Sequence, residues 1–172
     1  SRTDDDFSTT AIHGIDTAKY LAGSDYAAVD FQYNAMKLNG KKCLNTSLAC
    51  TFASGATGNL TFLPSSGCTI ERATVTVKED TYFLELPVWN SLDTPGRLVR
   101  VHKGQVVKSV FGDALCDENE IFLTNGFYRE NELFFDQLKS KEKVEQDVSS
   151  GMQSVDIANH MRTYEKQYIR LA

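Results

Sequence analysis

The sequence lacks the features of several large protein classes. No stretch approaches the roughly 20 consecutive apolar residues that a membrane-spanning helix needs, so we expect a soluble chain without a membrane partner. Basic residues are scarce relative to acidic ones, 18 against 23, which argues against broad electrostatic binding to nucleic acid. The chain begins at Ser1 rather than at Met, and the sequence assigns no cellular localisation.

Cysteine and histidine are also scarce, with four and three residues. No Cys-x-x-Cys pair is present, so we expect no metal site and no cofactor. On one continuous strand, Cys43 and Cys50 would point to opposite faces, too far apart for a disulfide. We therefore predict reduced, mostly buried thiols, although the glycosylation sequons at Asn45 and Asn59 would suit a secreted protein.

Catalytic motifs are missing. The sequence contains no Gly-x-Ser-x-Gly, no His-Glu-x-x-His and no phosphate-binding loop. The best nucleophilic set is Cys116 with His102 and Asp113, because a thiolate needs a base and the base needs an orienting carboxylate. Nothing in the spacing selects this triad, and we predict that the protein is not an enzyme.

Two other patterns are weaker still. Asp113, Asp117, Glu118 and Glu120 gather oxygens of the kind that bind calcium, but no Gly stands where a calcium loop needs its sharp turn. This run is therefore predicted to be an acidic surface loop. The single tryptophan, Trp89, is not placed near the first strand as in small-ligand-binding barrels, and we expect a core or inter-subunit anchor.

The strongest positive signal is the dipeptide Asn-Gly, at Asn39-Gly40 and Asn125-Gly126, between runs of alternating apolar and polar residues. It favours a two-residue hairpin turn, because both turn positions need positive φ. Folding the chain about Asn39-Gly40 pairs Leu38 with Lys41. The same register places apolar pairs on one face: Ala35 with Leu44, Phe31 with Leu48, and Val29 with Cys50.

Alternation predicts further strands: Leu60 to Leu63, Ala73 to Leu86 about a turn at Glu79-Asp80, Leu98 to Val101 and Val106 to Val110 about Lys103-Gly104, and Ile121 to Leu123 and Phe127 to Arg129 about Asn125-Gly126. We therefore predict a mainly β (α+β) fold, a small antiparallel β-barrel or sandwich built from hairpins. It carries a short N-terminal helix and a C-terminal helical arm.

Helix signals flank the strands. Asp16 is predicted to cap a short helix that ends at Ala22, before Gly23. Asn131 is predicted to cap a second helix. The apolar side chains of that helix should dock onto the sheet: Leu133, Phe134, Phe135 and Leu138.

The expected domain organisation has three parts. These are a β-barrel or sandwich domain with flanking helices over residues 1–138, a polar spacer over 139–151 and an amphipathic helix over 152–172. The last helix carries an apolar stripe: Ile157, Met161, Tyr164, Tyr168 and Leu171. Beyond a polar spacer, such a stripe packs either on the chain's own sheets or on another protein.

These features lead to a functional prediction. We expect a non-catalytic structural or adaptor protein that assembles with copies of itself or with a protein partner, using the five stripe residues as contacts. Small β modules with helical arms and polar loops suit viral or phage particles, so we expect a viral component.

Two alternatives stay open. A nucleic-acid-binding barrel would use the cationic segment around the Lys103-Gly104 turn: Arg97, Arg100, His102, Lys103 and Lys108. A secreted ligand-binding or host-interaction domain would require oxidised cysteines.

Overall fold

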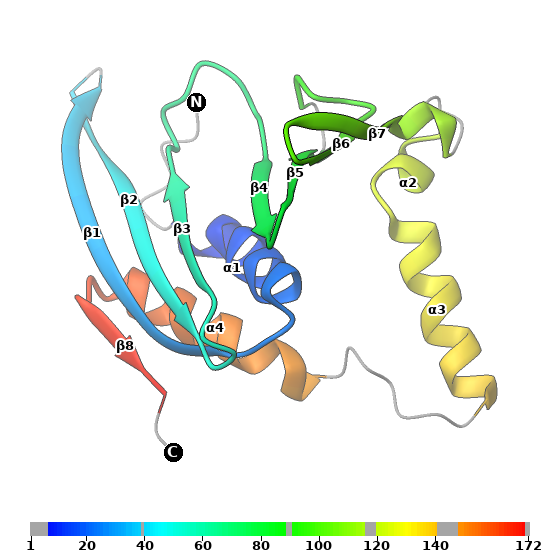
Figure 1. Ribbon diagram of the computed structural model, residues 1–172. Coiled ribbons are helices and arrows are strands. Elements are labelled where there is room, and N and C mark those ends of the chain that lie inside the picture. Colours follow the sequence, from blue (N-terminus) through cyan, green and yellow to red (C-terminus); the bar gives the residue numbers. More distant parts are fainter. Residues whose placement is uncertain (1–6, 39, 89–90, 116–119, 141–147, 171–172) are drawn as a thin grey trace. The chain divides into compact units, whose positions relative to one another are not determined.

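Two four-stranded antiparallel sheets and several helices make up a mixed α+β fold (Figure 1). The computed structural model describes residues 7–38, 40–88, 91–115, 120–140 and 148–170. The chain forms two compact units, one made of Ser1–Gly67 with Glu145–Ala172 and the other of Cys68–Val144. The predicted α+β class is confirmed, but the predicted barrel is wrong because neither described sheet closes on itself. A sandwich stays a prediction.

The elements of the first unit are α1 (Ser8–Ala22), β1 (Tyr26–Leu38), β2 (Lys41–Phe52), β3 (Thr57–Phe62), α4 (Val148–Arg162) and β8 (Gln167–Ile169). Its strands lie in the order β3-β2-β1-β8. The predicted hairpin register is confirmed: Ala35 pairs with Leu44, Phe31 with Leu48, and Val29 with Cys50. The turn residue Asn39 lies outside the described residues.

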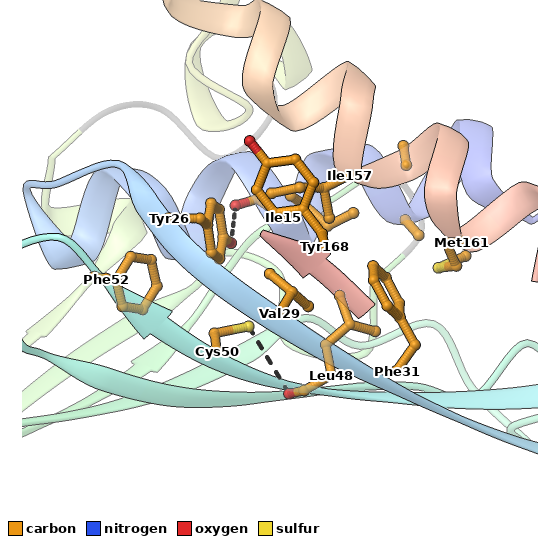
Figure 2. Close-up of a cluster of buried hydrophobic side chains, with 12 residues drawn as sticks. Ile15, Tyr26, Val29, Phe31, Leu48, Cys50, Phe52, Ile157, Met161 and Tyr168 are labelled. Carbon is orange, nitrogen blue, oxygen red and sulfur yellow. Dashed lines mark hydrogen bonds between the residues drawn. The ribbon is translucent and has the colours of Figure 1, made fainter. Parts of the chain in front are cut away.

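The core of the first unit lies on one face of this sheet, where α1 and α4 pack against each other. Figure 2 shows side chains of the strands pointing toward those of the helices. The largest fully buried side chains come from both layers: Ile15, Tyr26, Val29, Leu48, Ser154 and Ile157. Because each large apolar side chain stabilises by about 1.5–3 kcal/mol when buried, this cluster is the main source of stability in the unit.

Specific hydrogen bonds fix the two helices to the start of β1. The Tyr26 hydroxyl donates to the Ile15 carbonyl oxygen at 2.6 Å. Gln153 Oε1 accepts from the Tyr26 backbone N–H, and Gln153 Nε2 donates to the Tyr26 carbonyl, both at 2.9 Å. The Gln153 amide thus makes the two backbone hydrogen bonds to Tyr26 that a neighbouring strand would otherwise make. The Ser154 hydroxyl donates to Asp16 Oδ1 at 2.8 Å, which ties α4 to α1.

The first helix is longer than predicted. It begins at Ser8, about two turns before Asp16, because Ala11 and Ile15 continue its buried face toward the N-terminus. Asp16 is therefore an interior residue and not the cap. The predicted end is confirmed, since Gly23 adopts the left-handed conformation at φ 58° and its N–H donates to the Tyr20 carbonyl at 3.0 Å.

The predicted helix over 152–172 is wrong in its second half. Helix α4 ends at Arg162, and β8 then pairs antiparallel with β1 over Ala28 to Asp30. The chain turns at Tyr164, which has a φ of 58°. This residue sits in a conformation that favours glycine. Its ring contacts Tyr33 edge-on, with ring centroids 5.7 Å apart.

The elements of the second unit are β4 (Arg72–Val77), β5 (Asp80–Glu85), β6 (Arg97–His102), β7 (Gln105–Phe111), η1 (Gly112–Ala114), α2 (Ile121–Thr124) and α3 (Phe127–Ser140). The strands lie in the order β4-β5-β6-β7. The predicted β6–β7 turn is confirmed, with positive φ at both Lys103 and Gly104. The predicted β4–β5 turn is displaced, because Val77 pairs with Asp80 around Lys78-Glu79.

The predicted hairpin about Asn125-Gly126 is wrong, and two helices flank this dipeptide instead. Gly126, at φ 80°, donates its N–H to the Leu123 carbonyl and accepts from the Glu130 N–H through its own carbonyl. The left-handed residue that suits a hairpin turn therefore ends α2 here and precedes α3. Asn131 lies inside α3, and the side chains expected to dock onto the sheet are 44–55% exposed: Leu133, Phe134, Phe135 and Leu138.

The cysteine prediction is confirmed for the described residues. Cys43 and Cys50 are buried free thiols, and Cys68 is exposed. Burial raises the pKa of the Cys50 thiol to about 12. Cys116 lies outside the described residues. Among the described helices, none combines the length and apolar character needed to cross a bilayer.

Candidate functional site

Polar side chains of the second sheet gather on one of its faces. Asp80 of β5 lies directly opposite His102 of β6, and Tyr82 lies opposite Arg100. Arg100 is in turn opposite Lys108 of β7. Because directly paired residues share a face, these five side chains line one surface, which we call the charged face.

Asp80 is the centre of the charged face. Its carboxylate accepts two hydrogen bonds from Arg100, from Nε at 3.1 Å and from Nη2 at 2.9 Å. His102 Nδ1 lies 2.9 Å from Asp80 Oδ1. The Arg100 guanidinium also lies 5.8 Å from the centroid of the Tyr82 ring. One carboxylate therefore positions a guanidinium and an imidazole side by side.

The electrostatics of this group are mutually supportive. The hydrogen bond from Arg100, followed by that from His102, holds the pKa of Asp80 below its ordinary value. Hydrogen bonding to Asp80 likewise raises the pKa of Arg100. The side chain of Asp80 is 20% exposed, whereas those of Arg100 and His102 are each 41% exposed. The carboxylate is thus ionised and partly covered, while the Arg100 guanidinium and the His102 imidazole reach solvent.

This arrangement gives His102 the chemistry of an acid–base group. An ionised carboxylate can only accept hydrogen bonds, so Nδ1 of His102 must carry the proton that lies toward Asp80. In the neutral ring Nε2 is then unprotonated and can take up a proton. A carboxylate that fixes the imidazole in this way recurs in enzymes that use histidine as a base.

Sequence reasoning missed Asp80 as a site residue. The predicted turn at Glu79-Asp80 placed it in a loop, whereas it is the first residue of β5. The structure therefore gives His102 a different carboxylate from the predicted one, since Asp113 is exposed in η1 and Cys116 lies outside the described residues. A turn at Lys78-Glu79 would have placed Asp80 at the start of β5, and the register between β5 and β6 then sets it opposite His102.

The five residues of the nucleic-acid alternative are dispersed. Arg100, His102 and Lys108 lie on the charged face, but Arg97 lies on the opposite face, 5.0 Å over the Phe111 ring. Lys103 lies in the turn and pairs with Glu79 at 3.0 Å. Acidic side chains thus pair with three of the five, which reduces the positive potential available to a phosphate backbone. Nucleic-acid binding stays a prediction.

The predicted partner contacts fall mainly in the core of the first unit. Ile157, Met161 and Tyr168 are buried there, with no more than 7% exposure. Tyr164 is half exposed, and Leu171 lies outside the described residues. Binding of a partner through this set stays a prediction.

The remaining candidates add no second site. Glu120 is exposed, whereas Asp117, Glu118 and Trp89 lie outside the described residues. Within the described ranges, no group of three or more His, Cys, Asp or Glu side chains is placed to hold a metal ion.

Comparison with known proteins shows a likeness of fold. The sequence matches no protein-family model and no curated protein. The structure is similar to UDP-N-acetylglucosamine 3-dehydrogenase from Acidithiobacillus ferrooxidans, with a TM-score of 0.64 and 17% identity over 90% of this chain and 45% of that one. It is also similar to a protein assigned as an NADPH-dependent oxidoreductase, from Desulfitobacterium hafniense, with a TM-score of 0.68 and 13% identity over 95% of this chain and 47% of that one.

These comparisons correct the functional prediction. The expectation of a non-catalytic structural or adaptor protein, and of a viral or phage component, is wrong, because the two similar structures are those of oxidoreductases. The expectation that the protein is not an enzyme is contradicted by the same finding. The chain spans less than half the length of these two structures.

Proposed function

We propose that this chain is the substrate-side part of an NAD(P)-dependent oxidoreductase and works with a dinucleotide-binding domain supplied elsewhere. The observation that carries this proposal is how much of this chain, and how much of each similar structure, the structural likeness covers. At least 90% of the chain, but less than half of each neighbour, takes part in the likeness to two oxidoreductases. A dehydrogenase of this kind needs both a nucleotide site and a surface that holds the substrate.

The missing part is the nucleotide site. Dinucleotides usually bind to parallel strands with a crossover helix and a Gly-x-Gly-x-x-Gly loop. The described sheets are entirely antiparallel, and the sequence contains no Gly-x-Gly. We therefore assign to this chain the contacts with substrate and the handling of the proton.

His102 is the residue we assign to proton transfer. When a hydroxyl compound is oxidised, a bound nicotinamide dinucleotide supplies the chemistry that accepts hydride from the carbon. The hydroxyl proton needs a base, and Nε2 of His102 meets this need because Asp80 holds the proton of the ring on Nδ1. Lys108, on the same face, would attract an anionic substrate.

The first experiment tests whether the nucleotide site lies outside residues 1–172. The natural polypeptide that contains this sequence is isolated, its mass is measured, and NADH and NADPH are titrated by fluorescence. We expect binding to the natural polypeptide, alone or with its partner chain, and none to residues 1–172. Binding to residues 1–172, or its absence from every natural form, would overturn the proposal.

A second experiment tests His102 in the natural protein, with sugar nucleotides as the first substrates because one neighbour is named for such a substrate. His102→Gln should lower kcat by about 10²–10⁴-fold without changing NADPH affinity. His160→Gln is the matched control, because His160 also lies near an aspartate, Asp156 at 3.5 Å, but on α4. Full activity of His102→Gln would exclude the proton-transfer role and leave the oxidoreductase proposal intact.

A further inference from the structure

Helix α3 carries a continuous apolar stripe. Residues seven and eleven positions after Phe127 return to the same side of the helix, because 3.6 residues make one turn. The stripe consists of Phe127, Tyr128, Phe134, Phe135 and Leu138. These side chains are 45–55% exposed, and the described part of the second unit packs α3 against α2 without extended contact to a strand. An amphipathic helix in this state has its apolar side uncovered.

The second sheet has an uncovered apolar surface of its own. It is a cluster of apolar side chains on the side opposite the charged face, and we call it the apolar face: Phe83, Val99, Val101, Val106, Val107 and Phe111. Four polar side chains share this side of the three strands: Thr81, Glu85, Arg97 and Ser109. The register shift beside Arg100 places Val106 and Val107 together on this side, next to Val101. Four of the six side chains are 47–65% exposed: Phe83, Val106, Val107 and Phe111. A cluster of exposed apolar side chains on a sheet is normally covered by another layer.

We propose that the α3 stripe of one copy of this chain covers the apolar face of a second copy, and that the exchange is reciprocal about a two-fold axis. A second copy is the occupant favoured by the structure because one chain carries both surfaces, and each lacks the layer that the other provides. Two copies therefore cover all four surfaces, with no other protein required. This inference does not depend on the proposed oxidoreductase function.

The area supports a reciprocal exchange over a one-way contact. A half-exposed aromatic side chain leaves about 100 Å² to bury, so the five side chains of the stripe offer roughly 500 Å². One docking event buries this area and a similar area on the partner, which is about 1,000 Å² in total. That is below the roughly 1,600 Å² of a standard stable interface, whereas two such contacts give about 2,000 Å². A one-way contact would also leave one stripe and one face open and would build chains of molecules.

The test is size exclusion with light scattering on the 172-residue chain over a range of micromolar concentrations. We expect twice the 19.2 kDa mass of one chain. Phe134→Glu and Val107→Glu should each give the mass of one chain with an unchanged circular dichroism spectrum.

The chain offers a matched control for each change. Leu133 lies on α3 but off the stripe and is 44% exposed, against 45% for Phe134, so Leu133→Glu should stay dimeric. Val77 lies on the charged-face side of the sheet and is 53% exposed, against 54% for Val107, so Val77→Glu should also stay dimeric. If a Glu variant does not fold, Phe134→Ala replaces it and should raise the dimer dissociation constant at least tenfold.

Three outcomes would overturn the proposal. The first is a wild-type chain that is monomeric throughout. The second is a dimer that survives both Phe134→Glu and Val107→Glu. The third is a monomer that Phe134→Glu destabilises, because α3 would then cover the apolar face of its own copy.

Discussion

Replacing Ile157 with alanine should destabilise the first unit strongly. Ile157 is fully buried between α4 and the sheet, in the cluster that includes Ile15 and Val29. The change removes three carbon groups, which at about 0.8 kcal/mol for each buried CH₂ amounts to about 2.4 kcal/mol. The cavity left behind adds to this loss, and the total should be about 3–4 kcal/mol, within the range of about 2–5 for such changes.

The assay is urea unfolding followed by circular dichroism and by hydrogen exchange of the β1 amides, at two protein concentrations tenfold apart. Val155→Ala is the control, because Val155 lies on α4 but is 47% exposed, and it should change stability by less than about 0.5 kcal/mol. A loss below about 1 kcal/mol for Ile157→Ala would refute the assignment to the core. A loss that depends on protein concentration would show that Ile157 contacts a partner instead.

Other predictions concern single contacts. Because the pKa of Asp80 is lowered in the folded state, its contribution to stability is present above the ordinary carboxyl pKa and is lost as pH falls through the native value. The stability difference between wild type and Asp80→Asn should therefore shrink in acid urea titrations, and a difference independent of pH would contradict this. The exposed Cys68 should react with iodoacetamide at pH 8 much faster than Cys50, whose thiol pKa is raised to about 12 by burial; equal rates by peptide mass spectrometry would contradict the burial. Tyr164→Gly relieves a φ of 58° but removes the ring contact with Tyr33, so thermal unfolding should show a net change within about 1 kcal/mol.

Local patterns predicted the structure well where two signals agreed. Around Asn39-Gly40, alternation and turn chemistry specify the same register, and every predicted pair is found. At β4–β5 the turn was misplaced by one position, which displaces each partner by two residues. The faces were still correct, because side chains in a strand repeat with a period of two.

Prediction failed where one local signal fits two structures. At Asn125-Gly126, a glycine with positive φ can turn a hairpin or end a helix, and the helical periodicity of the following residues decides between them. The stripe of Ile157, Met161 and Tyr168 likewise suits one long helix, whereas the chain turns at Tyr164 and returns as β8. That return depends on pairing with β1, more than a hundred residues earlier, which no local window contains.

The candidate site shows the same limit. His102 was recognised from its position beside a tight turn, but its partner Asp80 was not, because a carboxylate opposite in a sheet is found only from the register. The likeness to oxidoreductases lies at 13–17% identity and in a fold without a motif of its own, so it required the three-dimensional structure.

The first unit is discontinuous in sequence, and this has a consequence for synthesis. The strands β1 to β3 leave the ribosome early, but α4 and β8 follow only after the whole second unit. At about 5–20 residues per second, the 85 residues between Phe62 and Val148 take roughly 4 to 17 s. During that interval the nascent sheet has an unpaired edge at β1 and lacks the helix that covers much of its apolar side. Newly made chains should therefore depend on chaperones, and messages truncated before the codon for Val148 should yield products that are rapidly degraded.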